Sequence, residues 1–416
     1  MDIFGDLEKR GLLDQFSDEK KIRELLSSPH TIYCGFDPSA KSLQLGNFIM
    51  ISILQRLQKA GHRVIAVLGG GTGMIGDPSG KKAERKFLDR DAIFANANAI
   101  KNQLSKYIDT TDPKKGLIVN NYDWWSKIDV LTFLRDYGKN FQINMMLDKD
   151  VIKNRLEAGI SYAEFSYMLL QSGDFARLYE KEGCNIQIGG GDQWGNLTSS
   201  LDFVKRRFGP DTPCEVFTFK LITDSNGKKF GKSENGALYL DPELTSPYRL
   251  YQYFMNVSDL DVRRYLYIFD SRPVEEIDKL YAAHMEHPEL RQGQKELARV
   301  IVTAVHGEKA AEVCKTMSEA LFKNDFKGLD SKELLELTDG LVIANETEDI
   351  SLLDALVLTK LAQSKREARE FVKNGAVLVN GEKVTDLDAV VKKEEALDGG
   401  FIFLRRGKKN YAVLKY

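Results

Sequence analysis

The sequence predicts an α/β protein whose first half forms a doubly wound, mostly parallel sheet, followed by an all-helical domain and a small α+β domain. In the first half, strand-like and helix-like runs alternate, as parallel strands joined by crossover helices require. After residue 246 the strand-like runs stop and helical patterns follow one another. From residue 351 onward, two helical patterns precede two hairpin patterns.

Chain length and local composition predict where these domains begin and end. A chain of 416 residues is longer than one hydrophobic core usually organises. We expect the α/β domain over 1–246 and the helical domain over 247–321, with helices at 246–255, 259–269, 273–284 and 290–321. The polar, acidic segment 322–350 is predicted to be a weakly structured linker before the α+β domain at 351–416.

The composition is that of a globular protein from a reducing compartment. Hydrophobic residues make up 43% of the chain, charged residues make up 29%, and the formal net charge is −2. The N-terminus is too charged for a signal peptide, and no apolar run reaches membrane-spanning length, so we expect a cytoplasmic protein. The cysteines are far apart and form no C-x-x-C pair, which argues against a zinc site or a disulfide framework; they are Cys34, Cys184, Cys214 and Cys314.

The stretch 31–60 is predicted to be a strand, a turn and a helix. Residues 31–36 are strand-like, 37–39 are turn residues, and an apolar helix runs over 49–60 and stops at Gly61. At the carboxyl edge of a parallel sheet, free backbone N–H groups and the helix dipole favour an anionic ligand. Gly46 would let a flat ligand lie close to the backbone. An ordinary strand–turn–helix connection would show the same pattern.

Residues 71–76 carry the G-x-G-x-x-G pattern of a dinucleotide-binding turn. That pattern requires a helix to open inside it. Pro78 lacks an N–H donor and disfavours the helical conformation at Asp77, so the Asp-Pro-Ser-Gly run at 77–80 predicts a turn instead. The spacing of a P-loop also fails, because Ile75 stands where a glycine is needed. We therefore predict a close-approach loop that carries one carboxylate, Asp77, with a basic tip after it.

Three further stretches carry polar groups suited to a ligand. On the predicted helix 162–174, Tyr167, Gln171 and Asp174 share one face, although a solvent-exposed face would have the same spacing. A strand at 185–188 ends in three glycines followed by Asp192, an arrangement that suits a ribose hydroxyl. The glycine-containing loop 227–233 could gather its lysines around phosphate oxygens, although most such loops are plain surface loops.

The last 66 residues are basic, with 13 Lys and Arg against 9 Asp and Glu. The helix that Ser364 caps is expected to end at Gly375 and to pack Ala368, Phe371 and Val372 inward. The hairpin at 376–384 has a strong Asn-Gly turn, and the hairpin at 401–414 is expected to turn through 405–410. A basic helix face beside a basic hairpin tip suits the phosphates of folded RNA, although many charged faces are merely solvated. The predicted RNA-binding residues are Lys365, Arg366, Arg369, Lys373, Arg405, Arg406, Lys408 and Lys409.

Taken together and in order, these stretches resemble the bacterial-type tyrosyl-tRNA synthetases, within the class I aminoacyl-tRNA synthetase family. The KFGKS run at 229–233 is similar to the mobile lysine- and serine-containing loop of the family, and QLGN at 44–47 falls where the family has a His-x-Gly-His signature. GDPSGKK, YMLLQSGDF and GDQWGN are features of the tyrosine branch. The basic tail resembles the small RNA-binding domain first known in ribosomal protein S-four.

The resemblance implies a Rossmann-like catalytic domain, an anticodon-side helical domain and an RNA-binding tail. It also implies a homodimer that uses ATP, accompanied by Mg²⁺, to convert tyrosine to tyrosyl-adenylate and then transfers tyrosine to tRNA(Tyr). No resident metal site is expected. The tyrosine carboxylate is itself the nucleophile, so catalysis would consist of positioning and charge stabilisation.

The resemblance also implies a role for each motif residue. Tyrosine binding is expected from Tyr33 and Asp174 at the hydroxyl, from Asp77, Tyr167 and Gln171 at the ammonium, and from Gln193 near the α-phosphate. The pyrophosphate end of ATP is expected to meet Ser39, Gln44, Lys82, Arg85, Lys229 and Lys232, which with Asn47 form the predicted catalytic set. The rest of ATP is expected to meet Cys34, Gly35, Asp37, Gly46, Asn47, Gly190, Asp192, Phe230, Gly231 and Ser233.

One departure from the family pattern concerns the signature histidines. Gln44 and Asn47 take their places, and none of the five histidines of the chain lies in a motif. An amide N–H can donate where an imidazole N–H would, and neither position needs an acid or a base. We therefore predict an active enzyme in which Gln44 donates to a terminal phosphate oxygen.

Three other functions are compatible with parts of the sequence. The first is an RNA-binding protein that has the synthetase fold but no aminoacylation activity. The second is a nicotinamide oxidoreductase based on the glycine pattern at 71–76, which the turn at Pro78 and the basic tail disfavour. The third is a synthetase for another amino acid, against which Tyr33 with Asp174 favours tyrosine.

Overall fold

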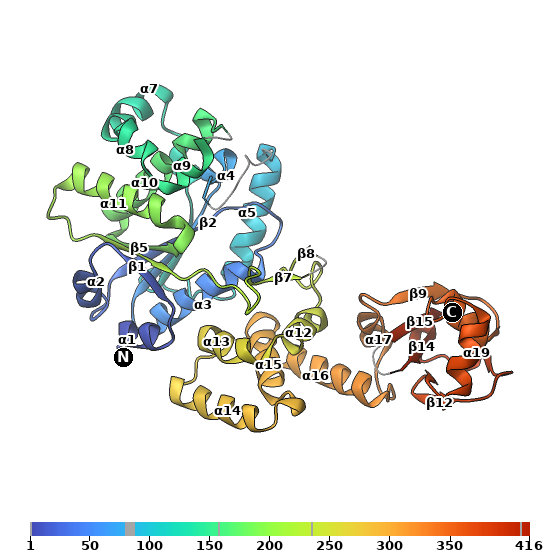
Figure 1. Ribbon diagram of the computed structural model, residues 1–416. Coiled ribbons are helices and arrows are strands. Elements are labelled where there is room, and N and C mark those ends of the chain that lie inside the picture. The colour runs from blue at the N-terminus through green and yellow to red at the C-terminus, as the bar shows by residue number, and fades with distance from the viewer. Residues whose placement is uncertain (1, 80–87, 157–158, 234–235, 408–409) are drawn as a thin grey trace. The chain divides into compact units, whose positions relative to one another are not determined.

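The computed structural model describes residues 2–79, 88–156, 159–233, 236–407 and 410–416 (Figure 1). The chain forms two compact units. Unit 1 comprises Met1–Leu244 with Ser258–Glu286, and unit 2 comprises Thr245–Val257 with His287–Tyr416. No helix among the described residues is long and apolar enough to cross a membrane.

Unit 1 is built on a six-stranded sheet of order β1-β6-β5-β2-β3-β4, which confirms the predicted doubly wound, mostly parallel sheet. Its strands are β1 (Leu13–Phe16), β2 (Thr31–Phe36), β3 (Arg63–Leu68), β4 (Gly116–Asn120), β5 (Cys184–Gly190) and β6 (Glu215–Phe219). Neighbouring strands from β6 to β4 are parallel, and β1 joins the edge at β6 antiparallel. The chain passes from β2 to β3 on one side and later returns to β5 on the other side. The carboxyl ends of β2 and β5 therefore form a topological switch point, where ligands bind in open α/β sheets.

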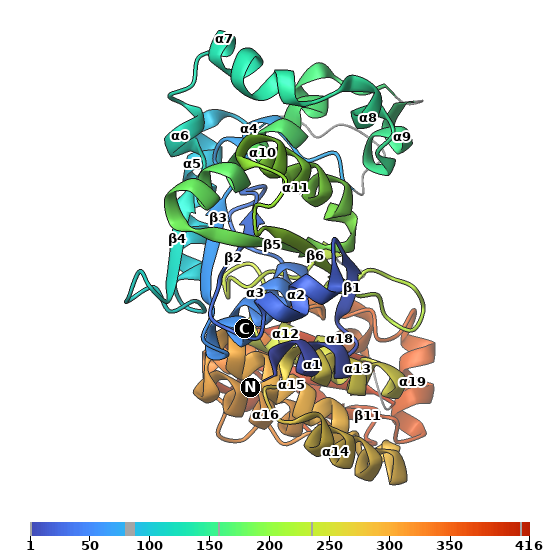
Figure 2. The ribbon, with the colours of Figure 1, turned by 90° about the vertical axis from the view of Figure 1, so that its left-hand side faces the viewer.

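Helices cover both faces of this sheet (Figures 1 and 2). On one face, α10 (Tyr162–Glu182) and α11 (Trp194–Phe208) bury a core that includes Tyr33 and Ile65 from the sheet and Phe175 and Leu197 from the helices. On the other face lie α3 (Leu45–Lys59) and α5 (Arg90–Leu104). The remaining helices of unit 1 are α1 (Ile3–Lys9), α2 (Glu19–Leu25), α4 (Thr72–Ile75), α6 (Tyr122–Trp125), α7 (Val130–Thr132), α8 (Ile143–Leu147), α9 (Asp150–Leu156), α13 (Asp259–Phe269) and α14 (Val274–Glu286), with short turns η1 (Phe133–Tyr137), η2 (Gly138–Asn140) and η3 (Gly191–Gln193). Unit 1 also has a small hairpin of β7 (Lys232–Ser233) and β8 (Gly236–Ala237).

Unit 2 combines a helical part with a small sheet. Its helices are α12 (Pro247–Met255), α15 (Gln292–His306), α16 (Glu308–Lys323), α17 (Ser331–Leu337), α18 (Leu352–Leu358) and α19 (Lys365–Lys373). A five-stranded sheet has the order β12-β11-β14-β15-β9, from β9 (Val342–Asn345), β11 (Val377–Val379), β12 (Glu382–Val384), β14 (Phe401–Arg406) and β15 (Asn410–Lys415). A pair of short strands, β10 (Ile350–Ser351) and β13 (Val390–Val391), stands beside it. The α18 and α19 helices pack on these sheets through Leu356, Ala368 and Val372.

The expectation of weak structure in 322–350 is wrong, because this segment contains α17, β9 and the first residue of β10. Asp330 caps α17 by accepting from the backbone N–H groups of Lys332 and Glu333, and Glu333 accepts from Asp330 N in return. The β9 strand pairs in parallel with β15. Pairing with a strand some 70 residues later stabilises a segment whose composition alone predicts little order.

Three smaller expectations also need correction. The predicted helix 290–321 is two helices, α15 and α16, because Gly307 lies between them with a positive φ of 92°. The predicted loop at 71–76 contains a single helical turn, α4, which ends at Gly76 with a φ of 87°. The last hairpin turns later than expected, since β14 continues through Arg406 and Gly407 follows it.

Candidate active site

A cavity of about 340 Å³ lies at the carboxyl ends of β2 and β5, at the switch point of the sheet. It brings together most of the residues predicted to bind tyrosine and the nucleotide. Those that line it are Tyr33, Cys34, Gly35, Asp37, Ser39, Gly46, Asn47, Asp77, Tyr167, Gln171, Asp174, Gly190, Asp192 and Gln193. Met50, Thr72, Asn121, Leu197 and Leu221 also line the cavity, and none of them was predicted from the sequence.

Asp174 is the most deeply buried carboxylate of this cavity, with 3% of its surface exposed. Its Oδ1 accepts from Trp124 Nε1 at 2.8 Å and from Trp125 Nε1 at 2.7 Å. Its Oδ2 accepts from Asn121 Nδ2 at 3.0 Å. Burial raises the pKa of Asp174 to about 7, although these three donors act in the opposite direction.

The three donors were missed by the sequence reasoning. They lie at the end of β4 and in α6, and Asn121 N is held there by a hydrogen bond of 3.0 Å to Leu68 O. The run Asn-Asn-Tyr-Asp-Trp-Trp at 120–125 follows the predicted strand 116–119 directly. Its position after a strand end was therefore the available signal, although the run has no distinctive spacing.

Tyr33 offers a buried hydroxyl to the cavity. The residue is 2% exposed, and its hydroxyl has no hydrogen-bond partner among the described residues. Burial raises the pKa of Tyr33 well above its ordinary value, and the nearby Asp174 carboxylate raises it further. A buried hydroxyl without a partner is costly, so a ligand that bonds to it gains specificity.

A second carboxylate, Asp37, lies directly after β2 and contacts α4 and α10. Its Oδ2 accepts from Tyr167 OH at 3.0 Å, and its Oδ1 accepts from Thr72 Oγ1 at 2.9 Å. Thr72 in turn accepts from Asn121 Nδ2 at 3.0 Å. Asn121 therefore connects Asp174 and Asp37 through hydrogen bonds, which relates the two ends of the cavity.

The third carboxylate, Asp77, is held by the turn that follows the glycine-rich loop and by η3. Its Oδ2 accepts from Gln193 Nε2 at 2.6 Å, and its Oδ1 accepts from Ser79 N at 2.9 Å. Gln171 Oε1 is buried beside the cavity with no hydrogen-bond partner among the described residues. A carboxylate and an unpartnered amide oxygen are acceptors that suit an ammonium group.

The side of the cavity that is expected to receive the nucleotide is formed by the start of α3. Gln44 N donates to Asn47 Oδ1 at 3.0 Å, which leaves the Asn47 amide N–H₂ to donate to a ligand. Gly46 is exposed, as a flat ligand near the backbone would need. Gln44 is half-buried and does not line the cavity.

The KFGKS loop is anchored beside this helix start. Phe230 packs against Tyr265 and Phe269, with ring centroids 5.0 and 5.4 Å apart. A Cβ on Gly231 would lie 3.1 Å from Gly46 N, so glycine allows the close approach of the loop to α3. Lys229 and Lys232 are exposed. The side chain of Ser233, together with Lys82 and Arg85, lies outside the described residues.

The thiol of Cys34 and the carboxylate of Asp192 both belong to the cavity wall. Cys34 lies on β2, and Asp192 lies in η3, directly after the neighbouring strand β5. Burial raises the pKa of Cys34 to about 12, so the sulfur is a neutral thiol. Among the described residues, no group of three or more His, Cys, Asp and Glu could hold a metal ion.

In unit 2, the predicted RNA-binding residues divide into two groups. Lys365, Arg366, Arg369 and Lys373 are all exposed on α19. Arg406 lies with its guanidinium carbon 4.8 Å from the centroid of the Phe371 ring, so this half-buried ring supports a basic side chain. Arg405 is half-buried and donates to Asn324 Oδ1 at 2.8 Å. Lys408 and Lys409 lie outside the described residues.

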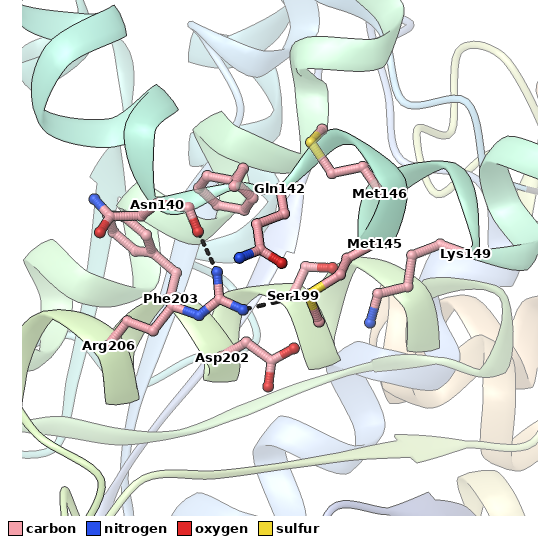
Figure 3. A pocket seen from close by; sticks show the side chains of 10 residues that line it. Asn140, Gln142, Met145, Met146, Lys149, Ser199, Asp202, Phe203 and Arg206 are labelled. Carbon is pink, nitrogen blue, oxygen red and sulfur yellow. Dashed lines mark hydrogen bonds between the residues drawn. The ribbon is translucent and has the colours of Figure 1, made fainter.

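A smaller pocket lies between α8 and α11, away from the predicted residues (Figure 3). Arg206 crosses it and donates to the backbone oxygen of Asn140. None of the predicted catalytic, tyrosine-binding or ATP-binding residues lines it. We therefore place the candidate active site in the cavity at the carboxyl ends of β2 and β5.

Family models and individual relatives both match this chain. The family model of class I tRNA synthetases (W and Y) matches residues 26–323, and that of the SYY-like C-terminal domain of tyrosine–tRNA ligases matches residues 333–414. The chain is 46% identical to the tyrosine–tRNA ligase of Bacillus caldotenax and 45% identical to that of Geobacillus stearothermophilus, over 100% of this chain and of each relative.

Solved structures have the same fold. A C-terminally truncated mitochondrial tyrosyl-tRNA synthetase of Aspergillus nidulans superimposes with a TM-score of 0.70 at 31% identity, over 77% of this chain and 94% of the other. The tyrosyl-tRNA synthetase of Archaeoglobus fulgidus, at 16% identity, shares the fold with a TM-score of 0.57 over 74% of this chain and 99% of its own. The chain therefore belongs to the class I tRNA synthetase family of the tryptophan and tyrosine type.

Proposed function

We propose that this chain is a tyrosine–tRNA ligase that activates tyrosine with ATP and transfers it to the 3′-terminal adenosine of tRNA(Tyr). The observation that carries the tyrosine assignment is the buried Tyr33 hydroxyl, which has no partner among the described residues and lies near the Asp174 carboxylate. A phenolic hydroxyl can accept from Tyr33 and donate to Asp174 at once, so it satisfies both groups. Phenylalanine would leave the Tyr33 hydroxyl without a partner and the remaining acceptor position of Asp174 unused.

The other groups of the substrates are assigned by the same chemistry. Asp77, Tyr167 and Gln171 receive the ammonium of tyrosine, with Gln193 holding Asp77 in place. Cys34 and Asp192 receive the ribose, and Asp37 lies at the α-phosphate. The start of α3 and the KFGKS loop receive the triphosphate, where Ser39, Gln44, Lys229 and Lys232, helped by Lys82 and Arg85, hold the pyrophosphate end. Mg²⁺ arrives on the ATP phosphates as part of the substrate.

In the first step, a carboxylate oxygen of tyrosine attacks the α-phosphorus of ATP, the bond from that phosphorus to the bridging oxygen breaks, and pyrophosphate leaves. No protein base is needed because the nucleophile is already ionised. The residues of the cavity accelerate the step by orientation and by stabilising negative charge on the leaving phosphates. In the second step, a ribose hydroxyl of the tRNA attacks the tyrosyl carbonyl, and AMP leaves.

The proposal includes tRNA recognition by the C-terminal part of the chain. The exposed basic side chains of α19, supported by Arg406 at the adjoining strand, provide the positive charges that phosphates attract. We assign residues 1–246 to catalysis, residues 247–321 to the anticodon-side domain, residues 322–350 to the connection with the tail, and residues 351–416 to RNA binding. We propose that the protein acts in the cytoplasm.

The proposed homodimer is supported by a concentration of exposed apolar side chains on 130–147. Val130 is 67% exposed, Leu131 is 75% exposed and Ile143 is 65% exposed. Monomeric proteins rarely expose so many large apolar groups in one segment, and such patches mark protein interfaces. A second copy of this chain is the partner that we propose for this segment.

Amino-acid-dependent exchange of pyrophosphate with ATP tests the central assignment. Tyrosine should support exchange, whereas phenylalanine should be rejected by about 10⁴- to 10⁵-fold in kcat/KM, the range known for tyrosine-specific enzymes of this family. Exchange driven by tryptophan instead of tyrosine would indicate that the enzyme activates another amino acid. Binding of tRNA without any amino-acid-dependent exchange would indicate an inactive RNA-binding relative, the alternative left open by the sequence.

The role of Gln44 is tested by rapid-quench measurement of tyrosyl-adenylate formation. Gln44→Ala should slow this step roughly ten- to a hundredfold, because one donor to the departing phosphates is lost, while the dissociation constant of tyrosine stays the same. Gln44→His should restore most of the rate, since an imidazole N–H donates in its place. An unchanged rate in Gln44→Ala would refute the role.

The dimer is tested by light scattering coupled to gel filtration. Wild-type protein should elute with twice the mass of one chain, and Leu131→Lys should elute as a monomer at low micromolar concentration because it places a charge in the apolar contact. Leu260→Lys is the matched control, because Leu260 is 72% exposed but lies on α13. A wild-type monomer, or equal effects of both substitutions, would contradict the proposed interface.

A further inference from the structure

Asp174 receives two indole N–H groups from consecutive residues, an arrangement that ordinary burial of a carboxylate does not require. Trp124 is nearly buried and belongs to the core beneath α10. Trp125 is half-buried and reaches the same oxygen from the other side of α6, with a distance of 2.7 Å from Nε1 to Oδ1. Because an oxygen has two lone pairs, the two indoles together occupy Oδ1.

The residue before Asp174 is adapted to the Trp125 indole. Gly173 lies inside α10, where glycine is less favourable than alanine. A Cβ on Gly173 would lie 2.4 Å from Cη2 and 2.6 Å from Cζ2 of Trp125, closer than atoms can approach. The indole therefore occupies the space that a side chain at 173 would need.

Two aromatic rings of η1 hold the indole from its other sides. The ring centroid of Phe133 is 5.9 Å from that of Trp125, and the centroid of Tyr137 is 5.1 Å away, both in edge-to-face geometry. The Trp125 N–H is thus fixed in direction by Gly173, Phe133 and Tyr137. It is a rigid donor rather than a mobile surface side chain.

We propose that Trp125, seated by Gly173, is a positioning residue that determines the discrimination between tyrosine and phenylalanine. With both lone pairs of Oδ1 occupied and one of Oδ2 used by Asn121, the carboxylate retains one acceptor position, on Oδ2. That position receives the substrate hydroxyl. The inference rests on the proposed function, and it adds that Trp125 fixes the direction in which Asp174 accepts.

Loss of the Trp125 N–H should also change the protonation of Asp174. This donor is one of those that lower the pKa of the buried carboxyl, so its removal raises that pKa further above neutrality. The charged and titratable groups nearby are Asp37, Tyr33, Tyr137 and Tyr167, and burial raises the pKa of all three tyrosines above the ordinary value. Asp174 is thus the group whose titration should show in tyrosine binding near neutral pH.

The test compares Trp125→Phe with Phe208→Leu. Both substitutions shorten a ring packed against the core beneath α10, but Phe208 contacts Tyr179 rather than Trp125, and only Trp125→Phe removes a donor to Asp174. We expect Trp125→Phe to raise KM for tyrosine in the exchange reaction by roughly tenfold, as the loss of one hydrogen bond to a charged group predicts, with KM for ATP unchanged. Discrimination against phenylalanine should fall by a similar factor, and the acid limb of kcat/KM for tyrosine should move to higher pH. Phe208→Leu should leave the limb and the discrimination as in wild type.

Gly173→Ala provides a second, independent arm. A methyl group at 173 should displace the indole and reproduce the loss of discrimination, although alanine favours the helix. In the Trp125→Phe background the same substitution should add less than it does in wild type, because the two closest indole atoms are gone and only Tyr137 Cε1, 2.9 Å from that Cβ, has to move. A discrimination ratio and an acid limb unchanged in Trp125→Phe, with wild-type protein active on tyrosine, would refute the role of Trp125 alone. Absence of tyrosine-dependent exchange in wild-type protein would instead refute the proposed function.

Discussion

The carboxylate of Asp174 is 3% exposed, and removing its charge from water carries a large cost unless donors surround it. The structure supplies Asn121, Trp124 and Trp125 from one short segment at the end of β4. These donors determine where α6 must lie against α10. They also leave the carboxylate able to accept one more hydrogen bond, in a cavity that the unpartnered Tyr33 hydroxyl also lines. The selectivity for a phenol that we propose thus follows from the way in which one buried charge is accommodated.

The same segment connects the two ends of the cavity. Asn121 donates to Asp174 and to Thr72, and Thr72 donates to Asp37, which also accepts from Tyr167. The single helical turn α4 exists between the glycines of the close-approach loop and places Thr72 in this chain of hydrogen bonds. A network with every member partnered holds its side chains in one arrangement. The two ends of the cavity, to which we assign the amino acid and the phosphates, are therefore positioned by shared residues.

Much of this site could be predicted from the sequence because its residues lie on regular elements. Tyr167, Gln171 and Asp174 share a face of α10 through helical periodicity alone. A helix after β2 was also expected, although α3 begins at Leu45 rather than at residue 49. Asn121, Trp124 and Trp125 could not be predicted in the same way, because they meet Asp174 across some 50 residues and only the folded sheet brings them together. The order in 322–350 was missed for the same reason, since β9 depends on pairing with β15.

Proton release on tyrosine binding tests the role of Asp174 most directly. Burial raises the pKa of this carboxyl to about 7, so part of the free protein carries the proton at pH 7. A substrate hydroxyl that donates to Asp174 requires the ionised form, so calorimetric titrations at pH 7 in buffers of different ionisation enthalpy should show net proton release on tyrosine binding. The release should shrink between pH 7 and pH 8, where the tyrosine ammonium keeps its proton, and should be absent in Asp174→Asn. Binding of tyrosine without proton release at pH 7, or with proton uptake, would contradict the account.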